Sequence, residues 1–253
     1  MTASGNSEPS TRARRIDWHA CADESAWIEA AVHGVRTALQ AGLDARSSTW
    51  LLLSGGTTPA PVYAALATQT LDWSRVVVSL VDERDVDPGA DGSNERLVRE
   101  TLMRERAGAA RFQPLHRVGE SLDHAVRASN AGWLRGDDAC KDASVSITVL
   151  GMGDDGHTAS LFPGAVNLAA ALASTEPYAA IDATGCAVAG IWPQRISLTP
   201  AGLAQAQQRI LLIRGDEKRA TFERALAAGD AREMPIRVAI DMAGAPLQVY
   251  WCP

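Results

Sequence analysis

The stretch WLLLSGGTTP, residues 50–59, predicts a buried strand, a glycine-containing loop and the first turn of a helix. The apolar run Trp50 to Leu53 suits a strand that is buried on both faces, as in parallel sheets. Pro59 is placed where a helix tolerates proline best, with Thr58 before it as the expected cap. A strand followed at once by a helix is the repeating unit of α/β proteins.

The same alternation continues on both sides of this stretch. We expect a helix that Asp23 caps and Gly42 ends, because apolar residues recur along it at helical spacing. Further helices are predicted from Ser93 through Glu105, over residues 122–134 with Gly136 closing the helix, and from about Glu217. Strands are predicted at residues 76–81, 145–150, 187–191, 209–213, 237–240 and 248–251. The sequence therefore predicts an α/β fold with a mainly parallel sheet.

The domain organisation is expected to be simple. Residues 1–15 are polar and rich in Ser, Thr and Arg, and we predict a flexible N-terminal tail there. Residues 16–253 show no repeat and no long linker, so we expect a single domain.

Composition excludes several classes of function. The net charge of −6 argues against a nucleic-acid partner, because phosphate backbones attract basic surfaces. No apolar run approaches the roughly 18–20 residues needed to cross a bilayer. The four cysteines are scattered, which predicts neither a metal site nor disulfides and favours a cytoplasmic protein.

Three unusual segments each follow a predicted strand directly. They are residues 54–58, 82–84 and 151–157. Because ligands of parallel α/β folds bind beyond the carboxyl ends of the strands, we expect the three segments to converge on one site.

The first segment is suited to a phosphate. Gly55 and Gly56 let the backbone approach a ligand, the next helix offers free N–H groups, and Ser54 and Thr57 add hydroxyls. The spacing is not that of the nucleotide P-loop. A plain strand-to-helix turn is the alternative interpretation.

The third segment supplies His157, which we predict to be a general base. The glycines before it could place amides near an oxyanion, and either Asp154 or Asp155 could orient the imidazole. A structural histidine that caps a turn is the alternative. The other histidines, His19, His33, His116 and His124, are interpreted as structural or solvated.

The remaining candidates are charged. Asp82 and Glu83 could act in acid/base chemistry, and Arg84 could hold a phosphate through paired hydrogen bonds. Arg195 and Lys218 are further phosphate candidates. A strand-end ion pair and a solvated lysine are the alternatives.

These segments, in this order, resemble the 6-phosphogluconolactonase family. The resemblance rests on residues 54–59, 82–84 with Ser93-Asn94, 151–163, 195–198 and 215–218, and it spans about residues 16–253. It implies a Rossmann-like three-layer sandwich and cofactor-free, metal-free hydrolysis of 6-phospho-D-glucono-1,5-lactone. It also implies that His157 is the base, with Asp155 as its partner, and that Arg84, Arg195 and Lys218 contact the substrate.

Two alternative functions stay open. The related glucosamine-6-phosphate deaminases share the glycine loop and the Asp-Gly-His turn, and there Asp82 would be the base. The run Thr158 to Phe162 and the arginine at position 84 favour the lactonase. A non-catalytic sugar-phosphate sensor is the second alternative. We expect a monomer whose partner is a small sugar-phosphate lactone, with no membrane partner.

Overall fold

The computed structural model describes residues 12–133 and 144–253. Its core is a seven-stranded sheet in the order β1-β10-β9-β6-β2-β3-β5, and every neighbouring pair is parallel. The strands are β1 Ile16–Ala20, β2 Thr49–Leu53, β3 Val76–Leu80, β5 Arg111–Phe112, β6 Ser144–Leu150, β9 Ala206–Arg214 and β10 Leu247–Cys252. The predicted α/β fold with a mainly parallel sheet is confirmed.

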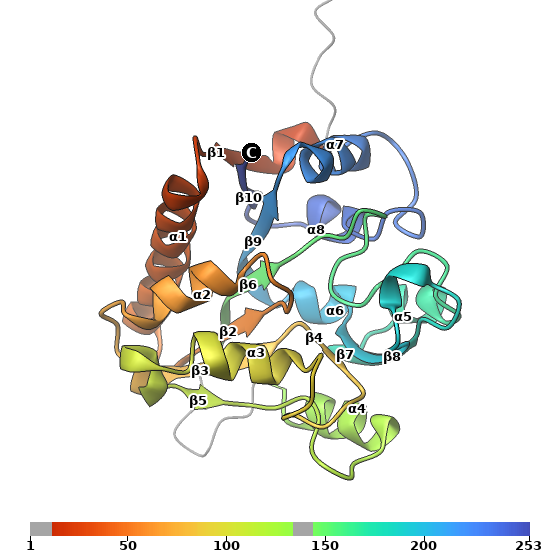
Figure 1. Ribbon diagram of the computed structural model, residues 1–253, viewed down its shortest axis with the longest axis horizontal. Helices are drawn as coiled ribbons and strands as arrows, with labels where there is room; N and C mark the ends of the chain where they lie inside the picture. The colour runs from red at the N-terminus through yellow and green to blue at the C-terminus, as the bar shows by residue number, and fades with distance from the viewer. Residues whose placement is uncertain (1–11, 134–143) are drawn as a thin grey trace, which may run out of the picture.

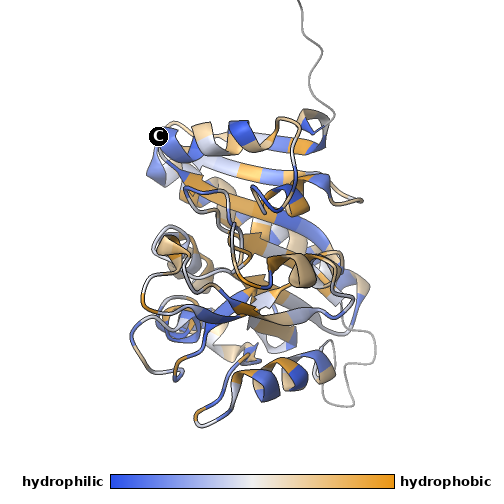
Figure 2. Cartoon of the chain, turned by 90° about the vertical axis from the view of Figure 1, so that its right-hand side faces the viewer, coloured by the Kyte–Doolittle hydropathy of each residue, from blue (hydrophilic) through white to orange (hydrophobic). Residues whose placement is uncertain are grey.

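Helices lie on both faces of this sheet and complete a three-layer sandwich (Figure 1). The α-helices of the described residues are α1 Glu24–Ala45, α2 Ala60–Ala67, α3 Asn94–Thr101, α4 Leu122–Ala131, α5 Leu168–Leu172, α6 Pro200–Leu203, α7 Asp216–Ala225 and α8 Arg237–Asp241. Figure 2 shows hydrophobic strands in the middle of the molecule and mixed helices around them. All five residues of β2 and of β3 are buried, as expected of strands covered on both faces.

A second sheet, which the sequence did not predict, lies beside the first. It is antiparallel, in the order β4-β8-β7, and consists of β4 Asp82–Arg84, β8 Gln194–Leu198 and β7 Tyr178–Asp182. A small apolar cluster of its own supports it, separate from the main core, and includes Phe162, Leu168 and Ile181.

Two of the predicted strands are wrong. Residues 187–191 contain the 3-10 helix Ala187–Ala189 and then Gly190 with φ +63°, a conformation that leaves a strand. Residues 237–240 belong to α8. Short apolar runs do not distinguish strand from helix by periodicity, and here the buried guanidinium of Arg237 donates to the carbonyls of Ala225 and Asp230 and holds the helical turn in place.

Helix ends differ from the predictions in several places. Asp23 caps α1 as expected, but the helix continues past Gly42 to Ala45. Ser93 caps α3, which ends at Thr101 rather than near Glu105. Helix α4 ends at Ala131, and the predicted closing residues 134–136 lie outside the described residues. Pro59, not Thr58, occupies the cap position of α2, without a side-chain cap.

The N-terminal segment is described only in part. Residues 1–11 lie outside the described residues, whereas Ala13–Arg15 form a 3-10 helix. The Arg12 guanidinium contacts both carboxylate oxygens of Asp241, at 2.6 and 2.7 Å. Within the two described stretches, no helix has the length and apolar character to cross a membrane.

Gly42 stands inside α1 because the helix lies close to the sheet. A Cβ atom at this position would be 1.8 Å from Ser146 Oγ and 2.9 Å from Thr49 Oγ1. We expect Gly42→Ala to lower the free energy of unfolding by about 1–3 kcal/mol through overpacking, measured by urea denaturation.

Helix propensity alone would predict the opposite effect, because Gly42→Ala would then raise the free energy of unfolding by about 1 kcal/mol. The exposed neighbour provides the control, because Ala41→Gly should cost about 1 kcal/mol through propensity only. A stabilised Gly42→Ala variant would contradict the close packing.

Candidate active site

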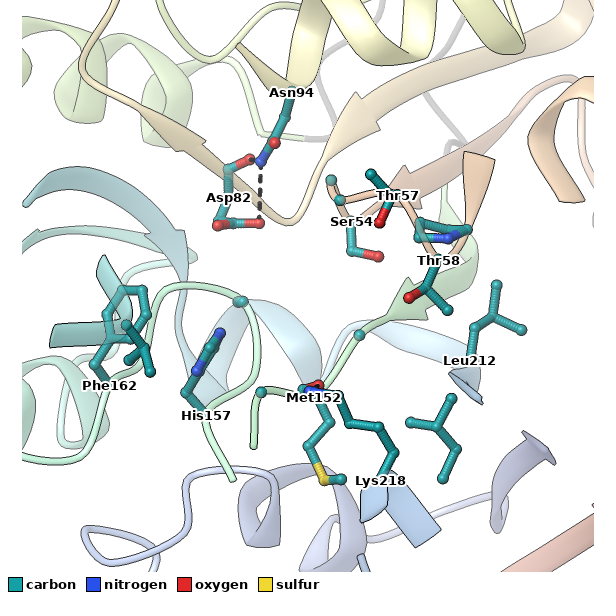
Figure 3. A pocket seen from close by; sticks show the side chains of 18 of the residues that line it. Ser54, Thr57, Thr58, Asp82, Asn94, Met152, His157, Phe162, Leu212 and Lys218 are labelled. Atoms are coloured by element: carbon teal, nitrogen blue, oxygen red, sulfur yellow. Dashed lines mark hydrogen bonds between the residues drawn. The ribbon is translucent and has the colours of Figure 1, made fainter. Parts of the chain in front are cut away.

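A polar pocket opens at the carboxyl edge of the central sheet (Figure 3). Of the predicted site residues, all line it except the carboxylates Glu83, Asp154 and Asp155: the lining includes Ser54, Gly55, Gly56, Thr57, Asp82, Arg84, His157, Arg195 and Lys218. The three segments predicted to converge do so, because β2, β3 and β6 are parallel neighbours that end at the same edge.

The glycine loop after β2 is fixed by a hydrogen bond from Tyr63 and by close packing against Asn94. The Tyr63 hydroxyl donates to the Ser54 carbonyl at 2.8 Å, and burial raises the pKa of Tyr63, which keeps this donor protonated. A Cβ on Gly55 would meet Asn94 Oδ1 at 1.8 Å, and Gly56 has φ +94°. Two glycines are therefore required here, one for a close approach and one for its backbone conformation. The loop leads into the free N–H groups of α2, which suits an anion.

His157 lies on a closed turn at the end of β6. The turn is fixed by the bonds Gly153 N to the His157 carbonyl, 2.9 Å, and Gly156 N to the Gly153 carbonyl, 3.0 Å. A Cβ on Gly153 would be 2.1 Å from His157 Nδ1, so the imidazole needs a glycine at that position. The ring also contacts Phe162, with the centroids 4.5 Å apart.

The structure brings Asp155, rather than Asp154, to the imidazole. Asp155 Oδ1 lies 2.6 Å from His157 Nδ1 and also accepts the His157 backbone N–H at 3.1 Å. Burial acts to raise the pKa of Asp155, but the hydrogen bond and charge of His157 outweigh it, and the pKa is lowered overall. An ionised Asp155 at Nδ1 leaves Nε2 as the ring nitrogen available for proton transfer.

Asp154, the neighbouring carboxylate, pairs with Lys218. Its Oδ1 lies 2.8 Å from Lys218 Nζ, which also donates to the Met152 carbonyl at 2.9 Å. Lys218 is in the first turn of α7, where a cation is unfavourable for the helix dipole, and the carboxylate offsets this.

Asp82 and Glu83 have different surroundings. Asp82 lines the pocket and accepts from Ser160 Oγ at 2.6 Å, while Asn94 Nδ2 donates to its carbonyl at 2.8 Å. Glu83 points away, into the start of α3, where its carboxylate accepts four hydrogen bonds. Burial raises the pKa of Glu83 against these bonds. Glu83 is thus a helix-anchoring carboxylate and not part of the pocket.

Arg84 and Arg195, two of the three arginines that line the pocket, are held by carbonyls and aromatic rings. Arg84 donates to the Gly92 carbonyl and lies 5.6 Å from the Trp192 ring centroid. Arg195 is buried and donates to the Trp192 and Ala189 carbonyls, at 2.5 and 2.9 Å. Burial lowers the pKa of Arg195, although the negative charge of Asp82 opposes this.

Sequence reasoning missed several pocket residues. Arg214, the last residue of β9, lines the pocket and pairs with Glu24 Oε1 at 2.6 Å. Met152, Phe162 and Asn94 also line it. The rule that strands end at the site could have identified Arg214, whereas the others depend on loop conformation. Over the described residues, no group of three His, Cys, Asp or Glu side chains is placed to hold a metal ion.

These features define an α/β protein with a histidine–carboxylate pair in a polar pocket suited to a small anionic ligand. The chain belongs to the family of glucosamine-6-phosphate isomerases and 6-phosphogluconolactonases, whose model matches residues 22–251.

Individual relatives agree with this assignment. The chain is 46% identical over 230 residues to a 6-phosphogluconolactonase of Xylella fastidiosa, covering 91% of this chain and 93% of that protein. It is 40% identical to a 6-phosphogluconolactonase of Rhizobium meliloti, covering 93% and 98%. The crystal structure of a 6-phosphogluconolactonase from Shewanella baltica matches with a TM-score of 0.83 at 32% identity, covering 93% of this chain and 97% of that chain.

We expect the hydrogen bonds of the Glu83 carboxylate to contribute measurably to the free energy of unfolding. In Glu83→Gln one carboxylate oxygen becomes an NH₂ group that faces donors, and we expect a loss of about 1–3 kcal/mol in the free energy of unfolding. The matched control is Glu100→Gln on α3, the helix that Glu83 contacts, because the Glu100 carboxylate is exposed and its loss should change the free energy of unfolding by about 0.5 kcal/mol or less. Equal effects of the two substitutions in urea denaturation would refute this role.

Proposed function

We propose that this protein hydrolyses 6-phospho-D-glucono-1,5-lactone to 6-phosphogluconate, with His157 as the general base. The observation that carries the proposal is the 2.6 Å contact between His157 Nδ1 and Asp155 in a pocket that also contains a glycine loop and cations. The names of the relatives at 40–46% identity support the substrate.

The phosphate end is assigned to the glycine loop. The loop amides and the start of α2 offer hydrogen-bond donors, and Lys218, Arg195 and Arg84 line the same pocket. When the phosphate is anchored, the lactone is held in a fixed position relative to His157, which lowers the entropic part of the activation barrier. It also orients the lactone so that C1 faces His157.

The reaction then proceeds by addition and ring opening. His157 Nε2 accepts a proton from water as the water oxygen bonds to C1, and Asp155 stabilises the imidazolium. The oxyanion that forms on C1 accepts a hydrogen bond from a backbone amide of the turn that carries His157, other than those of Gly153 and Gly156, which close the turn itself. The C1–ring-oxygen bond breaks next, and the imidazolium returns the proton to the ring oxygen.

Asp82 is assigned a positioning role in this scheme. Its carboxylate is already bonded to Ser160 and lies beside Asn94, so it is fixed in the wall of the pocket and can accept a hydrogen bond from a sugar hydroxyl. In an isomerase or deaminase the same group would have to be the base. Ammonia release from glucosamine 6-phosphate would favour that alternative, and tight 6-phosphogluconate binding without turnover would favour a sensor.

The proposal includes a monomer in the cytoplasm that uses no cofactor. The scattered cysteines support a reducing compartment such as the cytoplasm. Analytical ultracentrifugation would test the oligomeric state.

The activity is tested with lactone made in situ by glucose-6-phosphate dehydrogenase and NADP, with hydrolysis followed above the spontaneous rate. We expect His157→Gln to lower kcat by roughly 10²–10⁴-fold, because general-base catalysis contributes about that much. His124→Gln is the matched control, since His124 also contacts a carboxylate, that of Glu120 at 2.6 Å, but is exposed on α4.

The two parts of the proposal can fail separately. No acceleration by the wild type refutes the lactonase activity. Acceleration by the wild type and by His157→Gln alike keeps the activity and removes His157 from the mechanism.

Asp155 should act through His157 only. We expect Asp155→Asn to lower kcat about tenfold or more, because the imidazole loses the group that orients it and stabilises its charged form. The double variant with His157→Gln should lose little beyond His157→Gln alone, since the two residues act as a unit. Additive losses in the same assay would contradict the pairing.

A further inference from the structure

Lys218 differs from Arg84 and Arg195 in its partners and, like Arg214, contacts a carboxylate. Its ammonium group lies 2.8 Å from the Asp154 carboxylate, whereas the guanidinium groups of Arg84 and Arg195 donate to carbonyl oxygens. In the described part of the chain, neither arginine has a carboxylate within ion-pair distance. A ligand phosphate that reaches Lys218 therefore meets a cation whose charge is already neutralised.

The Asp154 carboxylate is poorly shielded. Its side chain is 76% exposed, against 27% for Lys218, so the carboxylate can turn into solvent without uncovering an apolar surface. Its backbone stays fixed, because the Asp154 carbonyl accepts the Thr221 hydroxyl at 3.4 Å and the next residue holds His157. The negative charge of Asp154 thus remains near the pocket even when its ion pair with Lys218 opens.

We infer that Asp154 is a specificity-determining counter-ion that competes with the phosphate group of the ligand for Lys218. This inference rests on the proposed function for the identity of the ligand. A phosphate that binds at Lys218 either shares the ammonium group with the Asp154 carboxylate or displaces it, and in both cases it lies near a negative charge, which weakens binding.

The competition acts more strongly on the product than on the substrate. Hydrolysis of the lactone creates a carboxylate, so 6-phosphogluconate carries one more negative charge than the lactone. The carboxylate of Asp154 lies in the same turn as His157, beside which the new charge forms. Asp154 therefore weakens retention of the product more than binding of the lactone.

The experiment measures the binding of inorganic phosphate and of 6-phosphogluconate by calorimetry, with lactone hydrolysis assayed in parallel. Asp154→Asn removes the charge and keeps the side-chain size. Glu29→Gln is the control, because it removes one negative charge from an exposed site on α1 that does not line the pocket. We expect Asp154→Asn to bind both anions roughly three- to fivefold more tightly, and 6-phosphogluconate to gain at least as much as phosphate.

The salt dependence separates a counter-ion from a structural change of the turn. The ratio of the affinity of Asp154→Asn to that of the wild type should fall towards one as the salt concentration rises to about 1 M, because the Debye length falls to roughly 3 Å. Unchanged or weaker binding by Asp154→Asn, an equal gain in Glu29→Gln, or a gain that salt does not reduce would each overturn the inference.

The inference and the proposed function fail in different arms. A wild type that hydrolyses the lactone while Asp154→Asn binds phosphate no better refutes the counter-ion alone. A wild type without lactonase activity refutes the proposed function, and the phosphate titrations then still decide whether Asp154 competes for Lys218. If neither the wild type nor Asp154→Asn binds inorganic phosphate or 6-phosphogluconate, the inference is also overturned.

Discussion

The backbone of Val81 joins the two sheets, and the pocket depends on this junction. Its N–H group donates to the Leu53 carbonyl at the end of β2, and its carbonyl accepts from the Leu198 N–H group of β8, at 2.9 and 2.7 Å. The chain therefore leaves the parallel sheet after Leu80 and enters the antiparallel sheet at Asp82. Because this change happens beside the last residue of β2, Asp82 and Arg84 lie across from the glycine loop that follows Leu53, as Figure 3 shows for Asp82. Residues of β4 and β8 thereby become a wall of a site whose floor is the central sheet.

The sequence predicted the parallel sheet but not the small one, and the reason is physical. Strands such as β2 are buried on both faces, so they appear as continuous apolar runs between glycine loops. Strand β7 is partly exposed, and strand β8 is largely buried but carries the polar residues Arg195 and Ser197, so neither appears as a continuous apolar run. Gly42 was interpreted as a helix end for a similar reason. A glycine that is needed for close packing against Ser146 has the same sequence signature as one that ends a helix.

The pocket could be predicted to the level of segments, because parallel strands bring their carboxyl ends to one edge whatever their side chains are. The local pattern could not assign partners within it, although the family resemblance implied Asp155 as the partner of His157. The turn closed by Gly153 and Gly156 directs Asp155 to His157 and Asp154 to Lys218. Asp82 and Glu83 separate in the same way, since alternate residues of a strand point to opposite sides. Asn94 lies in the pocket because Glu83 holds the first turn of α3 against β4.

A chain with a net charge of −6 can still present a pocket that attracts anions, because its carboxylates are already bonded to donors. Asp155 is bonded to His157, Asp82 to Ser160, and Glu83 to the first turn of α3. Arg84 and Arg195, in contrast, are held by neutral carbonyls and aromatic rings, so their positive charge is not cancelled at close range. The local excess of positive charge therefore arises because the pocket is lined by four cations, Arg84, Arg195, Arg214 and Lys218, and by one carboxylate, Asp82. Lys218 and Arg214 are the pocket cations that each contact a carboxylate, that of Asp154 and that of Glu24. Of these two carboxylates, Asp154 lies in the same turn as His157, so charge at the pair with Lys218 acts close to the site of the reaction.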